Sequence, residues 1–197
     1  MYKLFLNIMR KDIVTLIGMI LTLAFILIAF YGPWYSVNMS FAGQEGSVEM
    51  TLTQMVSKFY SQVQTITYEE AKTSSVTGLN TDKLDIFSNT MYIVIIALIF
   101  AFIGLVSIIG YLYSSTKSDK FKLFIGIFGI LVCILGLIAT IYFMTSGFYE
   151  SDFWFSQSMT GAEMSGGPGY AWYLMLIAAI IALISSILLF KKQSIQK

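Results

Sequence analysis

Four apolar stretches divide the sequence, and none of them contains aspartate, glutamate, lysine or arginine. They cover residues 13–31, 91–113, 123–144 and 171–190. A helix of about 20 residues crosses a hydrocarbon layer of about 30 Å. In lipid, a single segment satisfies its own backbone hydrogen bonds only as a helix. The pattern therefore predicts a mainly α membrane protein, with a four-helix transmembrane bundle in a single membrane domain over residues 1–197.

The charged residues lie between these spans and predict the orientation. Nine of the twelve lysines and arginines lie at the termini and in the inner loop 114–122, together with two of the eleven acids. The longer loops, 32–90 and 145–170, hold nine acids and three lysines. By the positive-inside rule we expect a multi-pass cell-membrane protein with cytoplasmic N- and C-termini. Cleavage of the first span as a signal peptide is the alternative, but that span is longer than a usual signal core.

The first outer loop begins with alternating polar and apolar residues, which is typical of a β-hairpin with one apolar face. The alternation runs over residues 35–41 and resumes over 47–52 after a glycine-containing turn. From 53 to 70 the apolar residues recur at intervals of three and four, which predicts one amphipathic extracellular helix. The polar segment 72–85 is expected to return irregularly to the membrane. The sequon at Asn38 makes that residue a candidate glycosylation site on the outer face.

The second outer loop is aromatic and ends in a glycine-rich run over residues 161–169. A short strand near Phe153 and Phe155 would extend the hairpin into a small extracellular antiparallel sheet. Aromatic residues in such a loop are typical of an interfacial belt and of a cap core, and a partner-binding patch is the alternative. The candidate cap and interaction residues of both loops are Trp34, Tyr35, Phe41, Phe153, Trp154 and Phe155.

Small residues recur along the spans and predict where the helices pack. In lipid, close approach of helix backbones drives association, and small side chains permit that approach. In the third span their spacing alternates between three and four, which favours a left-handed bundle with crossings near about +20°. A contact to a partner protein is the alternative use of one such seam. The candidate helix-packing residues are Gly126, Gly129, Cys133, Gly136 and Thr140 in the third span and Ala178, Ala182 and Ser185 in the fourth.

The composition offers little for catalysis. The sequence has no histidine and one cysteine, so we expect no disulfide within the chain, no metal site and no cofactor. Proton relays and ion-coupled transport need ionisable groups at membrane depth, and the spans offer only occasional serine and threonine. Phosphate-binding and nucleophile motifs are missing from the sequence. We therefore expect no enzyme activity, no nucleic-acid partner and no small-molecule substrate.

The order of these elements resembles the claudin/PMP22-like tetraspan superfamily. Residues 33–37, Pro-Trp-Tyr-Ser-Val, are similar to the stretch that opens the claudin outer sheet. The resemblance implies a claudin-like fold, with cytoplasmic termini and an outer sheet followed by a short extracellular helix. It also implies that Trp34 lies between the sheet and the helix tops. The chain lacks the Gly-Leu-Trp and the cysteine pair of claudins, which argues against tight-junction strands and a paracellular pore.

Together these patterns favour a non-enzymatic protein whose β-rich cap mediates protein–protein interaction, as in adhesion, envelope scaffolding or self-assembly. The expected partners are the lipid bilayer and another membrane protein or a second copy, as a homo-oligomer. One alternative is an accessory or structural subunit of a larger respiratory, oxygenase or transport complex. Another is a pore or transporter formed between subunits.

Overall fold

Four long helices form the membrane part of the structure, a computed structural model that describes residues 2–41, 43–59, 62–73, 84–113, 119–145, 155–159 and 162–190. Each helix is long and apolar enough to cross a membrane, as the sequence predicts. Three of them begin several residues before the predicted spans. The helices are α1 (Tyr2–Tyr31), α3 (Asp85–Tyr113), α4 (Asp119–Thr145) and α5 (Tyr170–Phe190).

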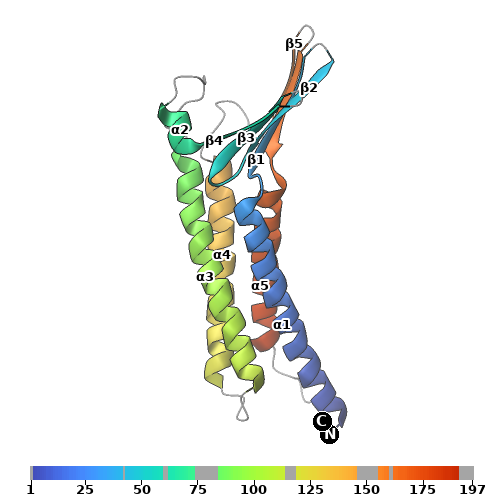
Figure 1. The fold of residues 1–197 in the computed structure, drawn as a ribbon. Helices are drawn as coiled ribbons and strands as arrows, with labels where there is room; N and C mark the ends of the chain where they lie inside the picture. Colours follow the sequence, from blue (N-terminus) through green and yellow to red (C-terminus); the bar gives the residue numbers. More distant parts are fainter. Residues whose placement is uncertain are drawn as a thin grey trace.

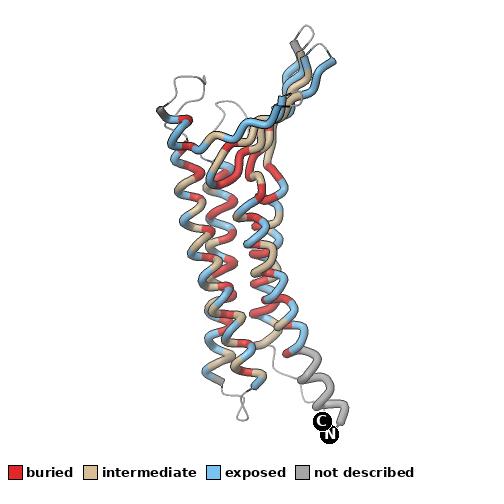
Figure 2. Tube along the Cα trace, viewed as in Figure 1, coloured by how far each residue is buried: buried red, intermediate tan, exposed pale blue. Residues whose placement is uncertain are grey.

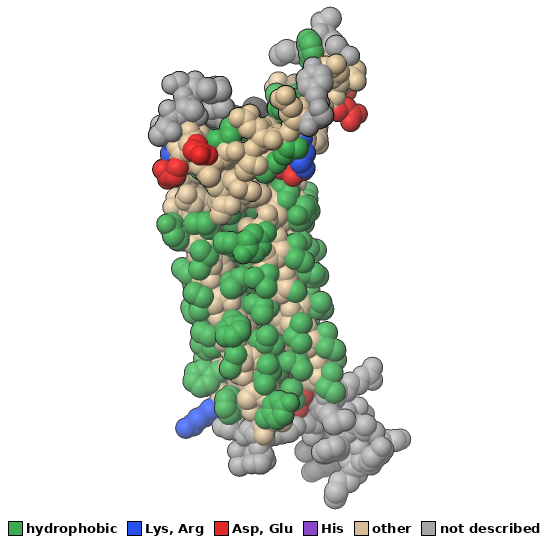
Figure 3. Space-filling model, viewed as in Figure 1, with side chains coloured by type: hydrophobic (Ala, Val, Ile, Leu, Met, Phe, Trp, Pro, Cys, Tyr) green, Lys and Arg blue, Asp and Glu red, His purple; other side chains and the backbone are tan. Residues whose placement is uncertain are grey.

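The four helices form a ring in which α1 and α4 each pack against both α3 and α5 (Figure 1). Large aliphatic side chains point away from this ring, and Ile17, Ile99 and Ile184 are each about half exposed. Figure 3 shows that, among the described residues on this face, the charged side chains lie on the part above the bundle and near the opposite end of the bundle, and not along its middle. The long apolar surface between these ends fits the hydrocarbon layer.

Six strands form one antiparallel sheet beyond the helix ends, in the order β4-β3-β2-β1-β6-β5. Two neighbouring inner strands, β1 and β6, connect directly to α1 and α5, which are neighbours in the bundle. The far end of the sheet therefore projects away from the bundle (Figure 1). The strands are β1 (Tyr35–Phe41), β2 (Gln44–Met50), β3 (Gln54–Phe59), β4 (Gln62–Thr67), β5 (Phe155–Met159) and β6 (Ala162–Pro168).

The predicted hairpin in the loop 32–90 is confirmed as β1 and β2. Tyr35 pairs with Met50 and Val37 pairs with Val48 across the two strands. In the turn, Gly43 has a φ of 78°, a conformation that glycine adopts without steric cost. The side chains of Tyr35, Val37 and Met50 are almost fully buried. The alternation of residues therefore predicted both the hairpin and the face that it buries.

The predicted amphipathic helix over residues 53–70 is wrong. The structure has a second hairpin there, β3 and β4, followed by the short helix α2 (Tyr68–Thr73). Met55 and Ile66, which a helix would place on one face, pair across the two strands and pack against the core. A few apolar residues spaced by three and four fit two strands equally well, and the β-branched residues of β4 favour a strand. The cap, defined here as the six strands and α2, therefore has a larger sheet and a shorter helix than predicted.

The loop between α4 and α5 contributes two strands to the sheet. Phe155 begins β5, so a short strand does extend the sheet, and β6 joins it to β1. Residues 162–168 of the glycine-rich run form β6, an inner strand of the sheet that the sequence pattern does not predict. Phe153, Trp154 and most of the polar segment 72–85 lie outside the described residues.

The buried core continues from the bundle into the base of the sheet, whereas the far end of the sheet is mostly exposed (Figure 2). A chain of four buried aromatic rings links these layers. Trp34 contacts Phe143 of α4 edge-on at 5.4 Å between ring centres, and Phe143 contacts Phe87 of α3 at 5.1 Å. Phe87 stacks on Tyr68 of α2 at 4.8 Å. The rings therefore tie the start of β1, two membrane helices and α2 together at one level.

Candidate functional site

The sheet has one polar face, and a groove of about 670 Å³ lies along it. Asn38, in the central strand β1, is exposed in this groove, and its glycosylation stays a prediction. The groove offers hydroxyl, amide and carboxylate groups to a ligand. The strand register places two rows of polar residues side by side, Ser47–Asn38–Ser165 and Glu45–Ser40–Glu163.

The charges on this polar face are predominantly acidic. Lys58 Nζ lies 2.8 Å from Glu49 Oε1, and both side chains are partly exposed. A surface ion pair of this kind contributes about 0–1 kcal/mol to stability. Glu45 and Glu163 are exposed further along the same face, so the groove favours cationic groups on a ligand.

The opposite face of the sheet is apolar, and the bundle covers only its base. Further out, Phe41 is 67% exposed, Phe59 is 41% exposed and Met164 is 37% exposed. Met39 pairs with Met164, and the ring of Phe59 lies over Gly46, where a Cβ would be 2.5 Å from it. We call Met39, Phe41, Phe59 and Met164 the distal apolar patch. Exposed apolar patches of this kind are typical of interaction surfaces.

The two edge strands of the sheet, β4 and β5, are both uncharged and contain no proline. Natural sheets usually protect an exposed edge with charged residues, proline or a bulge. Every described side chain of β4 except Ile66 is exposed. The cap therefore presents edges that can pair with an extended segment of another chain.

Among the predicted cap residues, Trp34 and Tyr35 lie in the core, whereas Phe41 is exposed. Trp34 is completely buried between the sheet and the helix ends, and its Nε1 donates a hydrogen bond of 2.7 Å to the carbonyl of Ala29. Its backbone N–H donates to the carbonyl of Met50 at 2.7 Å, and its carbonyl accepts from the N–H of Gly169 at 2.9 Å. Trp34 therefore holds the junction between α1 and the sheet.

Sequence reasoning missed the role of Tyr68, the first residue of α2. Its hydroxyl donates to the carbonyls of Thr51 and Gln54, in the turn between β2 and β3. Burial of this phenol raises its pKa far above the usual range. Within the turn, Thr51 Oγ1 accepts from the N–H groups of Thr53 and Gln54. Tyr68 thus fixes the second hairpin to the short helix.

The start of α2 has a capping box that the sequence signals as Thr-x-x-Glu. The N–H of Thr67 donates to Glu70 Oε2 at 2.9 Å, and the N–H of Glu70 donates to Thr67 Oγ1 at 3.3 Å. The hydrogen bonds from the backbone and side chain of Thr67 lower the pKa of Glu70. The carboxylate of Glu70 is exposed. The capping box therefore determines where α2 begins and does not form part of a buried site.

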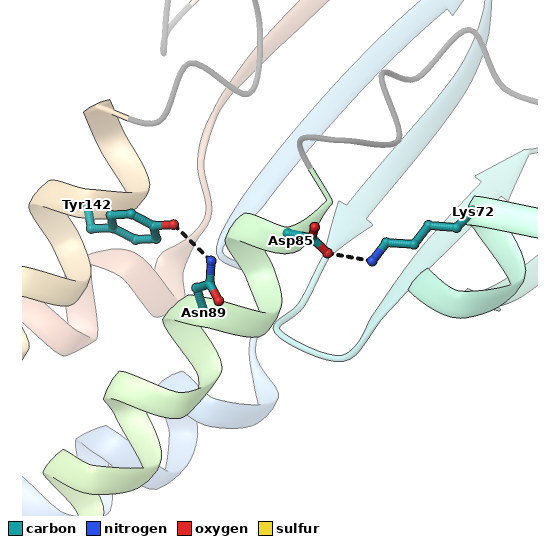
Figure 4. A network of polar contacts seen from close by, with 4 residues as sticks. All are labelled: Lys72, Asp85, Asn89 and Tyr142. Atoms are coloured by element: carbon teal, nitrogen blue, oxygen red, sulfur yellow. Dashed lines mark hydrogen bonds and ion pairs between the residues drawn. The ribbon is translucent and has the colours of Figure 1, made fainter.

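Two polar contacts join α2, α3 and α4 at the cap end of the bundle (Figure 4). Lys72 of α2 pairs with Asp85 at the start of α3, and this hydrogen bond raises the pKa of Lys72. Asn89 Nδ2 of α3 donates to the Tyr142 hydroxyl of α4 at 3.1 Å. The first contact links α2 to the bundle, and the second links two helices of the bundle to each other.

The small residues of α4 lie against α5. A Cβ on Gly129 would overlap the Ser186 hydroxyl and lie 3.2 Å from the carbonyl of Ala182. A Cβ on Gly136 would lie 2.8 Å from the Cβ of Ala179. These two glycines therefore allow close approach of α4 and α5 within one chain. The other candidate residues on this side, Gly126, Cys133, Thr140, Ala178 and Ala182, are also buried.

Polar side chains support the same helix interfaces. Thr140 Oγ1 donates to the carbonyl of Gly136 at 3.0 Å, and Trp172 Nε1 of α5 donates to the carbonyl of Thr140 at 3.0 Å. Ser185 faces α1, where a Cβ on Gly18 would overlap its hydroxyl. The fourth-span residues thus contribute to two interfaces of the ring.

Within the described part of the chain, no group of three or more histidine, cysteine, aspartate or glutamate residues is placed to hold a metal ion. The expectation that the protein uses no cofactor stays a prediction. The groups available in the cap are hydroxyls, amides, a few carboxylates and apolar side chains, which suit binding of a partner.

Comparison with known proteins identifies the family. A family model described as Clc-like matches residues 31–194, which include the complete sheet and three of the four membrane helices. No curated protein matches the sequence. The Clc-like family is a claudin-like tetraspan family, which agrees with the four apolar helices and the antiparallel sheet above them. Because this match covers most of its length, the chain belongs to the Clc-like family.

Proposed function

We propose that this tetraspan membrane protein is a non-enzymatic interaction protein, whose cap binds another protein or a second copy of the chain. The observation that carries the proposal is the distal apolar patch. It lies on the part of the sheet that projects beyond the bundle, so the chain's own helices do not cover it. Burying exposed apolar area on a partner is favourable, at about 25 cal/mol per Å² before the costs of association.

The open edges of the sheet support the same proposal. An extended segment that pairs with β4 or β5 would satisfy the free backbone groups of these strands. Apolar side chains of that segment would then continue the face that carries the distal apolar patch, because alternate residues of a strand share a face. Backbone pairing and apolar contact would act together in one interface.

We expect the double substitution Phe41→Ser, Phe59→Ser to reduce capture of the partner by about tenfold or more. Large aromatic side chains at the centre of an interface commonly contribute more than about 1.4 kcal/mol, which corresponds to a tenfold change. The measurement is in-cell crosslinking of the full-length protein, followed by quantification of the crosslinked species.

Val63→Ser is the matched control for this experiment. Val63 is 67% exposed, as Phe41 is, but the register places it beside Lys58 on the polar face. Crosslinking should therefore persist in Val63→Ser, and both variants should melt close to the wild type. Undiminished crosslinking in the double variant would contradict a partner site on the distal apolar patch.

We further propose that the cap lies outside the cell and that both termini lie in the cytoplasm. The charge distribution supports this orientation, because the basic residues gather at the termini and the inner loop. An external cap would meet partners on a neighbouring cell, in the envelope or in the same membrane.

Single-cysteine labelling tests this orientation. We expect a membrane-impermeant maleimide to label Gln62→Cys on intact cells, and to label Lys120→Cys only after permeabilisation. Both positions are exposed, and the native Cys133 is buried between helices, so it contributes little background. Labelling of Lys120→Cys on intact cells would reverse the proposed orientation.

A further inference from the structure

The polar groove of the sheet contains the asparagine and the hydroxyl residue of a glycosylation sequon. Asn38, Met39 and Ser40 form this sequon, Asn-x-Ser, and it is the only one in the sequence. Asn38 and Ser40 share the polar face, because alternate residues of a strand do, and both line the groove of about 670 Å³. A second hollow of about 210 Å³ is also lined by Asn38 and Ser165. Asn38 therefore lies where two hollows of the polar face meet.

The surroundings of Asn38 leave room for a group attached to its amide. The side chain is exposed, and within the described part of the chain its amide makes no hydrogen bond. Its neighbours across the strands are Ser47 of β2 and Ser165 of β6, which are both small. Gly166 and Gly167, which follow along β6 and line the second hollow, have no side chains. The first sugar of a glycan therefore fits over β1 and β6 without displacing a large side chain.

The chemistry of the groove suits a carbohydrate. Each sugar hydroxyl both donates and accepts hydrogen bonds, and the groove offers hydroxyl, amide and carboxylate groups. Glu45 and Glu163 lie on either side of Ser40 in the strand register, where their carboxylates can accept from sugar hydroxyls. Ser156 and Ser158 of β5 add two more hydroxyls. The volume of the groove is within the range of about 300–1,000 Å³ that is typical of small-molecule sites.

The composition of the groove favours an attached sugar over a free one. Sites for free ligands are lined mostly by apolar and aromatic side chains, whereas hydroxyl and carboxylate side chains predominate here. Hydrogen bonds exposed to water contribute little net affinity. A sugar that is covalently linked to Asn38 needs little affinity, because its linkage keeps it at a high effective concentration beside the groove.

We propose that Asn38 is an acceptor of N-linked glycosylation and that the first sugars of the glycan lie over the polar groove. This proposal rests on the external orientation proposed for the cap. The donor is an oligosaccharide linked to polyprenyl diphosphate, and an oligosaccharyltransferase catalyses the step. Nδ2 of Asn38 forms a bond to C1 of the first sugar, and the bond between C1 and the diphosphate oxygen breaks. Polyprenyl diphosphate leaves, and one amide proton passes to a base of the transferase.

A glycan at Asn38 would direct partners to the other face of the sheet. Consecutive residues of a strand point to opposite faces, so Asn38 and Met39 lie on different sides. The hydrophilic glycan would cover the polar face and leave the distal apolar patch uncovered. Glycosylation would therefore restrict protein partners to the face that carries Phe41 and Phe59.

The electrophoretic mobility of the full-length protein, expressed in cells that carry out N-glycosylation, tests the modification. We expect treatment with peptide N-glycosidase to increase the mobility of the wild type. Asn38→Gln and Ser40→Ala should lose this shift, whereas Ser40→Thr should keep it because threonine also completes a sequon. Ser36→Ala is the matched control, since Ser36 lies on the same face outside the sequon, and it should keep the shift. A shift that persists in Asn38→Gln would overturn the proposal.

Val63→Asn separates a failure of this site from a failure of the orientation. The substitution creates a sequon over residues 63–65, and Val63 is 67% exposed beside Lys58 on the same face. Combined with Asn38→Gln, it should restore the mobility shift. A shift in this double variant but not in the wild type would overturn glycosylation at Asn38 and leave the external cap standing. A shift in neither protein would overturn both proposals.

Cysteine labelling tests whether the glycan lies over the groove. We expect a maleimide to label Ser165→Cys several-fold more slowly in the glycosylated protein than after enzymatic removal of the glycan. Gln62→Cys is the control, because Gln62 is exposed on the edge strand β4 and does not line the groove. It should react at the same rate in both samples. Equal rates for Ser165→Cys would overturn the placement of the sugars over the groove.

Discussion

Replacing Gly169 by alanine is expected to lower the free energy of unfolding by about 3 kcal/mol or more, through steric overlap and a disrupted hydrogen bond. Gly169 lies between β6 and α5, at the point where the sheet joins the bundle. A Cβ there would overlap the carbonyl oxygen of Pro33 and lie 2.7 Å from its carbonyl carbon. The obstacle is backbone, so no side-chain rotation relieves it.

The carbonyl of Pro33 has little freedom to move away. It accepts a hydrogen bond of 3.1 Å from the N–H of Ala171, one of the free donors in the first turn of α5. The N–H of Gly169 in turn donates to the carbonyl of Trp34 at 2.9 Å. Moving the segment around Pro33 would strain both bonds, at the place where two strands connect to two helices.

Unfolding in detergent, followed by circular dichroism, measures this effect, and Gly46→Ala provides the control. A Cβ on Gly46 would also meet a close neighbour, 2.5 Å from the ring of Phe59. That ring is 41% exposed and is free to swing aside, so the control should cost less than about 1 kcal/mol. Equal stability of the two variants would show that the junction tolerates a side chain at Gly169.

The sequence predicted the parts of the fold that a local pattern determines. An apolar stretch of about 20 residues without charged side chains is enough to predict a membrane helix, because an unpaired charge in lipid is energetically costly. The first hairpin could also be predicted, because Tyr35, Val37 and Met50 alternate with polar residues and occupy one buried face. In each case one environment decides which residues are apolar. For the membrane helices it is the lipid, and for the hairpin it is the buried face of the sheet.

The errors lie where pairing between distant segments decides the structure. In β3 and β4, Met55 and Ile66 share a buried face because two strands pair, and their spacing alone also fitted a helix. The strand β6 contains two glycines and two polar residues, so its local strand propensity is low. It forms because it lies between β1 and β5, and the pairing with β1 joins segments more than a hundred residues apart.

The candidate site could be predicted only in part. Phe41 is one of the cap residues that the sequence predicts, and it is the most exposed member of the distal apolar patch. Phe59 and Met164 were missed as surface residues, because their exposure depends on how far the sheet projects beyond the bundle. The Thr-x-x-Glu spacing of Thr67 and Glu70 is a sequence signal for a helix start. It was missed because residues 53–70 were interpreted as one continuous helix.

The second large effect is expected for Trp34→Ala, which should lower the free energy of unfolding by about 3–5 kcal/mol. Trp34 is completely buried and begins the aromatic chain that continues through Phe143 and Phe87 to Tyr68. Its removal would leave a cavity that these rings cannot fill without losing their own contacts. It would also leave the carbonyl of Ala29, near the end of α1, without the indole N–H.

Trp34→Phe separates these two contributions. The phenyl ring keeps much of the apolar volume but cannot donate to Ala29, so this variant should lose about 1–2 kcal/mol from the hydrogen bond. Tyr31→Ala, at the same end of α1, removes a side chain that is 76% exposed and should change stability by less than about 0.5 kcal/mol.

The Trp34→Ala experiment also bears on the proposed function, because the junction sets the direction in which the sheet projects. If the bundle survives in Trp34→Ala, the cap should become sensitive to protease while the membrane helices stay protected. Partner capture through the distal apolar patch should then fall, although Phe41 and Phe59 are unchanged. A protease-resistant cap and wild-type stability in Trp34→Ala would instead mean that the sheet is held in place by β6 and α2 alone.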